Sequence, residues 1–357
     1  MILLALLCAL GLAAGFLLIR RVPTCPPAVP LSETSVSIII PSRNEERNLP
    51  RLLQSIAGSD TRPREILVVD DGSTDSTAAI AAGLGARVLK SAAKPNGWTG
   101  KAWACYQGAQ NAAGELFLFL DADTFLLPGG LDRVITCWIR ERNPRTVVSL
   151  LPYHAMNSAY EQLSLFFNFL MAAGAGGFGA AATRRLFGQS LMISRETYFE
   201  AGGHSAVRGV VLENLRWAST LRACGARIVC LGGKDTLHMR MFPEGFSQMS
   251  ESWAKAFLQG ASDSGCMVVV LAVVWISTLW TTTLLLIVPH HFGHFSVALA
   301  YFLFALQIAW LVRQLGSYRV STCLLFPLPL AFYCAVFARA AARRALGRKA
   351  VWRGREV

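Results

Sequence analysis

Long apolar runs near the two ends of the chain constrain its fold more than any other sequence feature. Met1 to Ile19 is almost uninterrupted, and Cys266 to Val288 forms a second long run. Phe295 to Val312 and Cys323 to Ala338 are two shorter runs. A helix needs about 20 apolar residues to cross a bilayer, so the first two runs predict spans and the last two are borderline. The sequence therefore predicts a membrane protein with a more polar middle.

Composition and charge agree with a membrane partner. Only 16% of the residues are charged, against about 25% in an ordinary soluble domain, although the net charge is +12. Much of the positive charge flanks apolar runs, where orientation and anionic lipid account for it, so nucleic acid is not the expected partner. The nine cysteines show no C-x-x-C pair, which favours reduced thiols. The flanking basic residues are Arg20, Arg21, Arg313, Arg319, Arg339, Arg343, Arg344, Arg348, Lys349, Arg353 and Arg355.

The first apolar run is interpreted as an uncleaved anchor. A signal peptide carries its positive charge before the apolar core, whereas Arg20 and Arg21 follow it here. Positive charge belongs on the cytoplasmic side, so the residues that follow are expected in the cytoplasm. Four spans would then leave the basic tail outside, so the number of spans stays open. The expected organisation is an anchor over 1–21, a proline-rich linker over 22–35, a central domain over 36–262, a transmembrane region over 263–340 and a basic tail over 341–357.

The central domain alternates strand and helix patterns. β-Branched apolar runs predict strands, and the segments between them have helical patterns. This alternation is typical of an α/β fold with a parallel sheet covered on both faces. The expected strands are 36–40, 65–69, 86–89, 116–120 and 188–193; the expected helices are 44–57 with Asn44 as N-cap, 76–84, 101–113 and one from about 196. Residues 160–183 are apolar but broken by glycines, and predict an interfacial helix, with a full span as the alternative.

Two pairs of aspartates follow predicted strands. Asp70 and Asp71 come directly after one strand, and Asp121 and Asp123 come after another. Ligands of parallel sheets bind outside the carboxyl ends of the strands, so these pairs are candidates for one site. Hard cations such as Mg²⁺ or Mn²⁺ prefer carboxylate oxygen and bind through one or two carboxylates plus substrate phosphates. The alternative for each pair is an ordinary turn, because Asp is a common turn residue.

Several segments together resemble family 2 glycosyltransferases with the GT-A fold. They are IIIPSRNEERNLPRLL, EILVVDDGSTDST and FLFLDAD, in this order. NGWTGKAWAC and RMFPEG, the latter followed by Trp253-Ala254-Lys255, resemble the membrane-anchored branch that acts on carotenoid acids such as diaponeurosporenoate. The resemblance covers about residues 36–260. It implies a GT-A type mixed, mostly parallel sheet with helices on both faces, in addition to the transmembrane helices expected at both ends.

The resemblance also implies a role for individual residues. Asp121 and Asp123 would flank the donor diphosphate and hold the metal, with Asp123 in direct contact. Arg240 and Trp253 match a late motif that contacts diphosphate and acceptor. The spacing in NGWTGK is not that of an ATPase P-loop. The residues implied to bind the nucleotide sugar are Pro41, Arg43, Glu45, Asp70, Asp71, Lys101 and Asp121.

One position departs from the family pattern. The family shows Glu-Asp where this chain has Glu213-Asn214, and the Asp is the base that deprotonates an acceptor hydroxyl. Asn cannot take up a proton at neutral pH. Three explanations stay open: the protein is inactive, Glu213 has taken over the role, or the acceptor is already an anion and needs no base.

The resemblance implies a membrane-bound, inverting transferase that faces the cytoplasm. Its donor would be a nucleotide-diphosphate sugar, with UDP-glucose favoured, and its cofactor Mg²⁺ or Mn²⁺. Its acceptor would be a lipophilic molecule, and a carotenoid carboxylic acid is the favoured class. The alternatives are a polyprenyl-phosphate glycosyltransferase and an inactive sugar-nucleotide-binding membrane protein.

Overall fold

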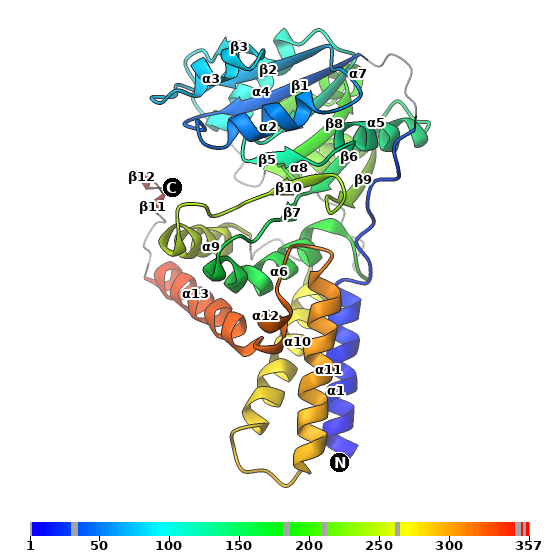
Figure 1. The fold of residues 1–357 in the computed structure, drawn as a ribbon, viewed down its shortest axis with the longest axis vertical. Helices are drawn as coiled ribbons and strands as arrows, with labels where there is room; N and C mark the ends of the chain where they lie inside the picture. Colours follow the sequence, from blue (N-terminus) through cyan, green and yellow to red (C-terminus); the bar gives the residue numbers. More distant parts are fainter. Residues whose placement is uncertain are drawn as a thin grey trace. The chain divides into compact units, whose positions relative to one another are not determined.

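The computed structural model describes residues 2–29, 35–180, 186–208, 213–260, 265–346, 351–352 and 355–356. The chain forms two compact units. The sheet unit comprises Pro23–Tyr153 and Arg184–Met239, and the helical unit comprises Met1–Val22, His154–Thr183 and Arg240–Val357. Their elements carry the same labels in Figure 1.

The sheet unit contains a seven-stranded mixed sheet in the order β3-β2-β1-β4-β8-β6-β9. Strands β3, β2, β1 and β4 are parallel to one another, β8 runs antiparallel to β4 and β6, and β9 is parallel to β6. The strands are β1 (Val36–Ser42), β2 (Glu65–Asp70), β3 (Arg87–Lys90), β4 (Leu116–Leu120), β6 (Thr146–Leu151), β8 (Ser190–Ser194) and β9 (Arg227–Gly232). A smaller sheet pairs β5 (Thr124–Leu126), β10 (Leu237–Met239) and β7 (Tyr153–His154).

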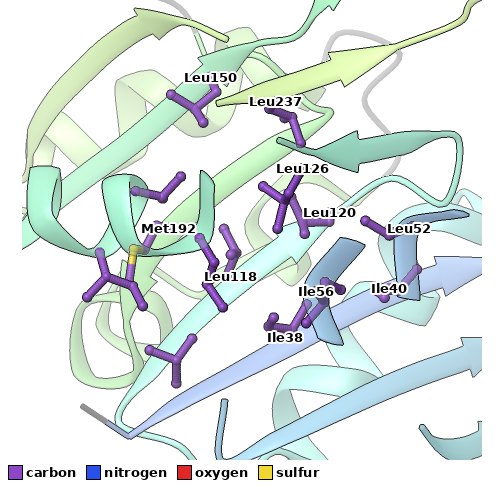
Figure 2. Close-up of a cluster of buried hydrophobic side chains, with 14 of the residues drawn as sticks. Ile38, Ile40, Leu52, Ile56, Leu118, Leu120, Leu126, Leu150, Met192 and Leu237 are labelled. Atoms are coloured by element: carbon purple, nitrogen blue, oxygen red, sulfur yellow. The ribbon is translucent and has the colours of Figure 1, made fainter. Parts of the chain in front are cut away.

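Helices cover this sheet on both faces, as the α/β pattern predicted. They are α2 (Leu49–Ala57), α3 (Thr77–Gly83), α4 (Gly100–Asn111), α5 (Gly130–Arg140), α7 (Arg195–Glu200), the 3₁₀-helix η2 (Gly203–Val207) and α8 (Glu213–Ala223). Because successive side chains of a strand point to opposite faces, Ile38 and Ile40 join the buried cluster with Leu52 and Ile56 of α2 (Figure 2), whereas Ile39 faces α4. Gly108 lets α4 approach, since a Cβ there would lie 2.5 Å from Ile39 Cγ2.

The sequence-based prediction of the helix after β1 was wrong about where this helix begins. The prediction started a helix at Asn44 as N-cap, but α2 begins at Leu49 and Asn48 occupies the N-cap position. Asn44 has a φ of 55°, a left-handed conformation that Asn tolerates better than most residues. Its side chain accepts hydrogen bonds from Thr74 instead of capping a helix. The acidic residues 45 and 46 therefore belong to a loop.

The helical unit holds the apolar runs. Helices α1 (Ile2–Leu18), α10 (Cys266–Leu285) and α11 (His294–Val312) run side by side (Figure 1). Within the described residues, α10 and α11 are the two helices long and apolar enough to cross a membrane, and α1 is a shorter apolar helix. Membrane helices at both ends of the chain thus stay a prediction.

The remaining elements of the helical unit pack around a second apolar cluster. This cluster joins η1 (Ala159–Ser164) and α6 (Leu165–Gly176) to α9 (Phe246–Gly260) and α13 (Pro327–Ala345). The apolar run predicted over 323–338 is divided, because α12 (Val320–Leu324) ends before α13 starts at a proline. Proline is favoured in the first turn of a helix and disrupts a helix interior. Two short strands, β11 (Val351–Trp352) and β12 (Arg355–Glu356), pair near the end of the chain.

Candidate active site

Three neighbouring strands end at one edge of the large sheet and bring the predicted acidic residues together. β1 lies between β2 and β4, and all three run in the same direction. Ser42 at the end of β1 pairs in register with Asp70 at the end of β2. Asp121 directly follows β4. The prediction that both aspartate pairs lie at the carboxyl ends of strands in one sheet is therefore confirmed by the topology.

The loops that follow β1 and β2 are bound to each other. The backbone N–H of Asn44 donates to Ser73 Oγ over 3.0 Å, and Thr74 N donates to Asn44 Oδ1 over 2.8 Å. Ser76 N donates to Glu46 Oε2 over 3.1 Å. These bonds order two polar loops that carry little apolar surface of their own.

Asp121 forms an ion pair with Lys101 from the first turn of α4. Lys101 Nζ lies 2.5 Å from Asp121 Oδ1 and 2.7 Å from Oδ2, and it donates to the carbonyl of Gly188 over 2.9 Å. Burial lowers the pKa of Lys101, but Asp121 together with the nearby Cys105 and Asp123 outweighs this effect, so the net shift is upward. Lys101 therefore stays charged and neutralises one of the carboxylates at this edge.

Asp123 has a different environment from Asp121. Its Oδ1 atom is buried and has no hydrogen-bond partner among the described residues. Burial and the nearby carboxylates of Asp121 and Glu45 raise the pKa of Asp123 to about 7. A buried carboxylate oxygen without a donor is costly, so this atom is suited to a cationic ligand.

The described residues of the acidic edge do not form a metal site from protein side chains alone. No group of three or more His, Cys, Asp or Glu side chains in the described ranges could hold an ion. This arrangement fits a cation that takes one or two carboxylates and completes its shell with substrate phosphates and water. The orphaned Oδ1 of Asp123 is the observation that favours such a ligand.

Asp70 and Asp71 lie at the end of β2. Asp70 is buried and accepts from Ser73 N over 3.1 Å. Asp71 Oδ2 lies 3.9 Å from Arg43 Nη1, so this ion pair is loose, and the arginine side chain is half exposed. Burial raises the pKa of Asp71, and Arg43 opposes this shift. The N-terminus of α4 approaches so closely that any side chain at Gly100 would overlap the Asp71 carboxylate.

The segment that carries Lys101 is held by an aromatic cluster that sequence reasoning missed. Trp98 is buried, with its ring 5.0 Å from that of Trp103 and 5.2 Å from that of Tyr106. Thr99 caps α4, accepting from Ala102 N through its side chain. The spacing of Trp103 and Tyr106 was a signal for part of this packing, since residues three apart share a helix face, whereas Trp98 precedes the helix.

A small cavity of about 60 Å³ lies beside the Lys101–Asp121 pair. It is far smaller than the roughly 300–1,000 Å³ of ligand pockets. Its lining residues are Pro41, Lys101, Cys105, Phe119, Leu120, Asp121, Leu186, Phe187, Gly188, Leu191, His204, Val207 and Trp217.

His204 lines this cavity as a neutral side chain. Its ring packs on Trp217, with centroids 4.5 Å apart, and its Nδ1 lies 2.9 Å from the hydroxyl of Tyr198. That hydroxyl accepts from His204 N, so its own proton is free to donate to Nδ1. Burial, followed by the charge of Lys101, lowers the pKa of His204 to about 3.

The presence of the other predicted residues at this edge stays a prediction. Glu213 and Asn214 begin α8, but their side chains lie outside the described part of the structure. Arg240 and Trp253 belong to the helical unit. There Arg240 Nε donates to Glu161 Oε1 over 2.8 Å, and Trp253 is buried and donates to Ser164 Oγ over 3.0 Å. Their roles stay predictions.

The buried His204 gives a testable pH dependence. Its pKa is near 3 when folded and near 6.5 when unfolded, so between these values the unfolded state binds more protons and stability falls as the pH decreases. From pH 7 to pH 5, the free energy of unfolding should fall by about 2 kcal/mol more in the wild type than in His204→Asn. Chemical unfolding of the detergent-solubilised chain at both pH values measures this difference. Equal pH dependence in the two proteins would show that His204 titrates normally.

Comparison with known proteins places the chain in a family. The model of glycosyl transferase family 2 matches residues 37–215, half of the 357-residue chain. A 4,4'-diaponeurosporenoate glycosyltransferase of Staphylococcus haemolyticus (strain JCSC1435) is 32% identical over 248 residues, 68% of this chain and 66% of that protein. The protein of the same name from Staphylococcus aureus (strain MRSA252) is 27% identical over 363 residues, 99% of this chain and 96% of that protein.

A solved structure shares the fold. It is the mannosyltransferase PcManGT from Pyrobaculum calidifontis in complex with GDP-Man and Mn²⁺, with a TM-score of 0.55 and 18% identity. The alignment covers 97% of this chain and 99% of that one. The mixed sheet with its acidic edge thus agrees with the family match, and the chain belongs to glycosyltransferase family 2.

Proposed function

We propose that this chain transfers a hexose from a UDP-sugar, with UDP-glucose favoured, to a lipophilic carboxylic acid in the membrane. The observation that carries the proposal is the buried, unpartnered Oδ1 of Asp123 at an acidic sheet edge, in a chain of glycosyltransferase family 2. A divalent cation would supply the positive charge that such an edge lacks, and a nucleotide diphosphate would complete the shell of that cation.

The donor would lie along the ends of β1, β2 and β4. The nucleoside is assigned to Pro41, Arg43, Glu45 and the Asp70–Asp71 pair, whose carboxylates can accept hydrogen bonds from base and ribose. The diphosphate is assigned to the region of Asp121 and Asp123. Mn²⁺ or Mg²⁺, held by Asp123 with Asp121 beside it, would neutralise charge on the leaving diphosphate.

Because Lys101 pairs with Asp121 and not with Asp123, we assign different roles to the two aspartates. It already neutralises Asp121, so Asp123 is the carboxylate left for a divalent cation. A lysine held 2.5 Å from one carboxylate also places a positive charge at the edge that can attract the donor phosphates. Arg240 and Trp253 are assigned to diphosphate and acceptor contacts on the strength of the motif they resemble.

The reaction is a single displacement at the anomeric carbon. An acceptor oxygen forms the new bond as the bond from carbon to the diphosphate oxygen breaks, and the nucleoside diphosphate leaves with that electron pair. A carboxylate acceptor needs no base, which accounts for Asn214 where the family has Asp. The names of the two staphylococcal relatives also point to a carotenoid acid as acceptor.

The membrane part is best explained by three crossings, by α1, α10 and α11. Gly11 and Gly15 of α1 allow close helix contact: a side chain at Gly11 would overlap Thr278, and a Cβ at Gly15 would lie 2.7 Å from Trp275 Nε1. Small residues four apart are typical of packed membrane helices. Because α13 starts at a helix break and carries Arg339 and Arg343, we assign it to the membrane interface. Three crossings put the catalytic domain and the basic tail together in the cytoplasm, and the multi-pass protein obeys the positive-inside rule.

Asp123 is the first residue to test. Asp123→Asn keeps the shape but removes the charge, and should lower Mn²⁺-dependent UDP-glucose binding and turnover by about 100-fold, roughly 2.7 kcal/mol. Calorimetry with Mn²⁺ or EDTA measures binding, and UDP release measures turnover. Asp60→Asn, at an exposed position, is the control. Unchanged donor binding in Asp123→Asn would refute the metal site.

Asn214 distinguishes the acceptor classes. Asn214→Asp restores a base, so turnover of an alcohol acceptor should rise by up to about 100-fold while turnover of an acid acceptor changes little. Assays with a long-chain acid and the matching alcohol compare the two. The glycolipid should be labile to mild base, as an ester is; lability to mild acid would indicate a polyprenyl phosphate acceptor. A large gain with the acid would contradict the proposal, and no transfer to any acceptor would support an inactive binding protein.

The three-crossing topology predicts which segments are accessible from outside the cell. An epitope inserted in the loop at 289–293 should be cleaved by protease added to intact cells, because this loop joins α10 to α11 on the outer side. An epitope at the C-terminus should be protected until the cells are opened. Cleavage of the C-terminal epitope in intact cells would favour an even number of crossings.

A further inference from the structure

An open groove of about 660 Å³ lies among α1, α11 and α12 of the helical unit. Its volume lies within the roughly 300–1,000 Å³ of ligand pockets. Leu303, Leu306 and Phe16 form much of its apolar surface, and all three are more than one-third exposed. Its lining on α11 extends from Leu303 to Arg313, about 15 Å along the helix and half the thickness of a bilayer core.

The groove is polar at one end only. Arg313 and Tyr318 line that end, and the guanidinium of Arg313 lies 5.4 Å from the ring centroid of Trp310. Phe16 packs edge-on against the same indole at 5.5 Å. No ion pair joins Arg313 to a carboxylate in the described part of the chain. A guanidinium is less hydrated than an ammonium and binds carboxylates through two parallel hydrogen bonds.

Gln307 does not contribute a free polar group to the apolar part. It is buried, its Nε2 donates to Leu12 O over 2.6 Å, and its Oε1 accepts from Trp275 Nε1 over 3.0 Å. Both polar atoms of the Gln307 side chain are therefore paired within the protein. Charge in a bound molecule would be favourable only at the Arg313 end.

We propose that this groove binds the acceptor, an amphiphile with one extended apolar chain that ends in a carboxylate at Arg313. The inference rests on the proposed function, which supplies the acidic acceptor and places Arg313 at the cytoplasmic end of α11. The groove accommodates the half of the chain nearest the carboxylate, and the remainder lies in lipid. Arg313 selects for the anionic end, and the aromatic pair of Phe16 and Trp310 supports a flat, rigid chain.

Binding is tested with the full chain in phosphatidylcholine nanodiscs and parinaric acid, a conjugated polyene carboxylic acid. Energy transfer from tryptophan to the polyene reports occupancy close to the protein. Arg313→Gln should weaken binding of the acid by about tenfold or more and leave its methyl ester almost unchanged. Leu306→Phe should weaken binding of both, because the larger ring fills part of the groove and adds no tryptophan to the energy-transfer donors. Arg20→Gln removes another exposed charge outside the lining residues and should change neither.

Two further readouts separate this inference from the proposed function. In turnover assays Arg313→Gln should raise the KM for the acid acceptor and leave the KM for the sugar donor unchanged. If the wild type bound the methyl ester as tightly as the acid, the proposed acceptor groove would be overturned. Displacement of the acid by phosphatidylglycerol would overturn it as well. Calorimetric binding of UDP-glucose with Mn²⁺ is measured on the same nanodiscs. If UDP-glucose did not bind, the proposed function alone would be overturned. If UDP-glucose bound but the acid did not, only the proposed groove would be overturned.

Discussion

Repulsion among carboxylates at one edge of the sheet is the constraint on which the site depends. Glu45, Asp121 and Asp123 approach each other there, and Lys101 neutralises Asp121. Burial and the charge that remains raise the pKa of Asp123, and one of its oxygens has no donor among the described residues. An edge of this kind is stable because helices and aromatic side chains hold it, and it gains most from a bound cation. Donor binding and catalysis would thus use the excess negative charge that the folded chain keeps at this edge.

The position of Lys101 illustrates how packing far from the reaction serves the site. The aromatic cluster around Trp98 and the cap at Thr99 fix the start of α4. Gly100 then lets the helix N-terminus approach Asp71, and the next residue reaches Asp121 across the sheet edge. A single segment thereby touches both acidic pairs, although they are 50 residues apart in the sequence.

The helical unit depends on a different interaction, the close packing of apolar helices. Helix α1 is an apolar segment of 17 residues, and its glycines let it pack closely on α10 and α11. The break before α13 separates an apolar run that sequence reasoning treated as one segment. A hydropathy pattern cannot reveal such a break, because Pro327 is compatible both with a kinked span and with a new helix.

The sequence by itself determined the alternation of strands and helices, the strand ends that carry the aspartates and the family, because these depend on local periodicity and on motifs of adjacent residues. Asn44 was misassigned as a helix cap because the sequence does not show that its side chain accepts a hydrogen bond from a loop 30 residues away. The tertiary structure alone decided that Lys101 pairs with Asp121 and that His204 is buried and neutral. It also decided that the groove beside α11 ends at Arg313. Each of these depends on contacts between residues far apart in the chain, and hydropathy or spacing cannot encode such distances.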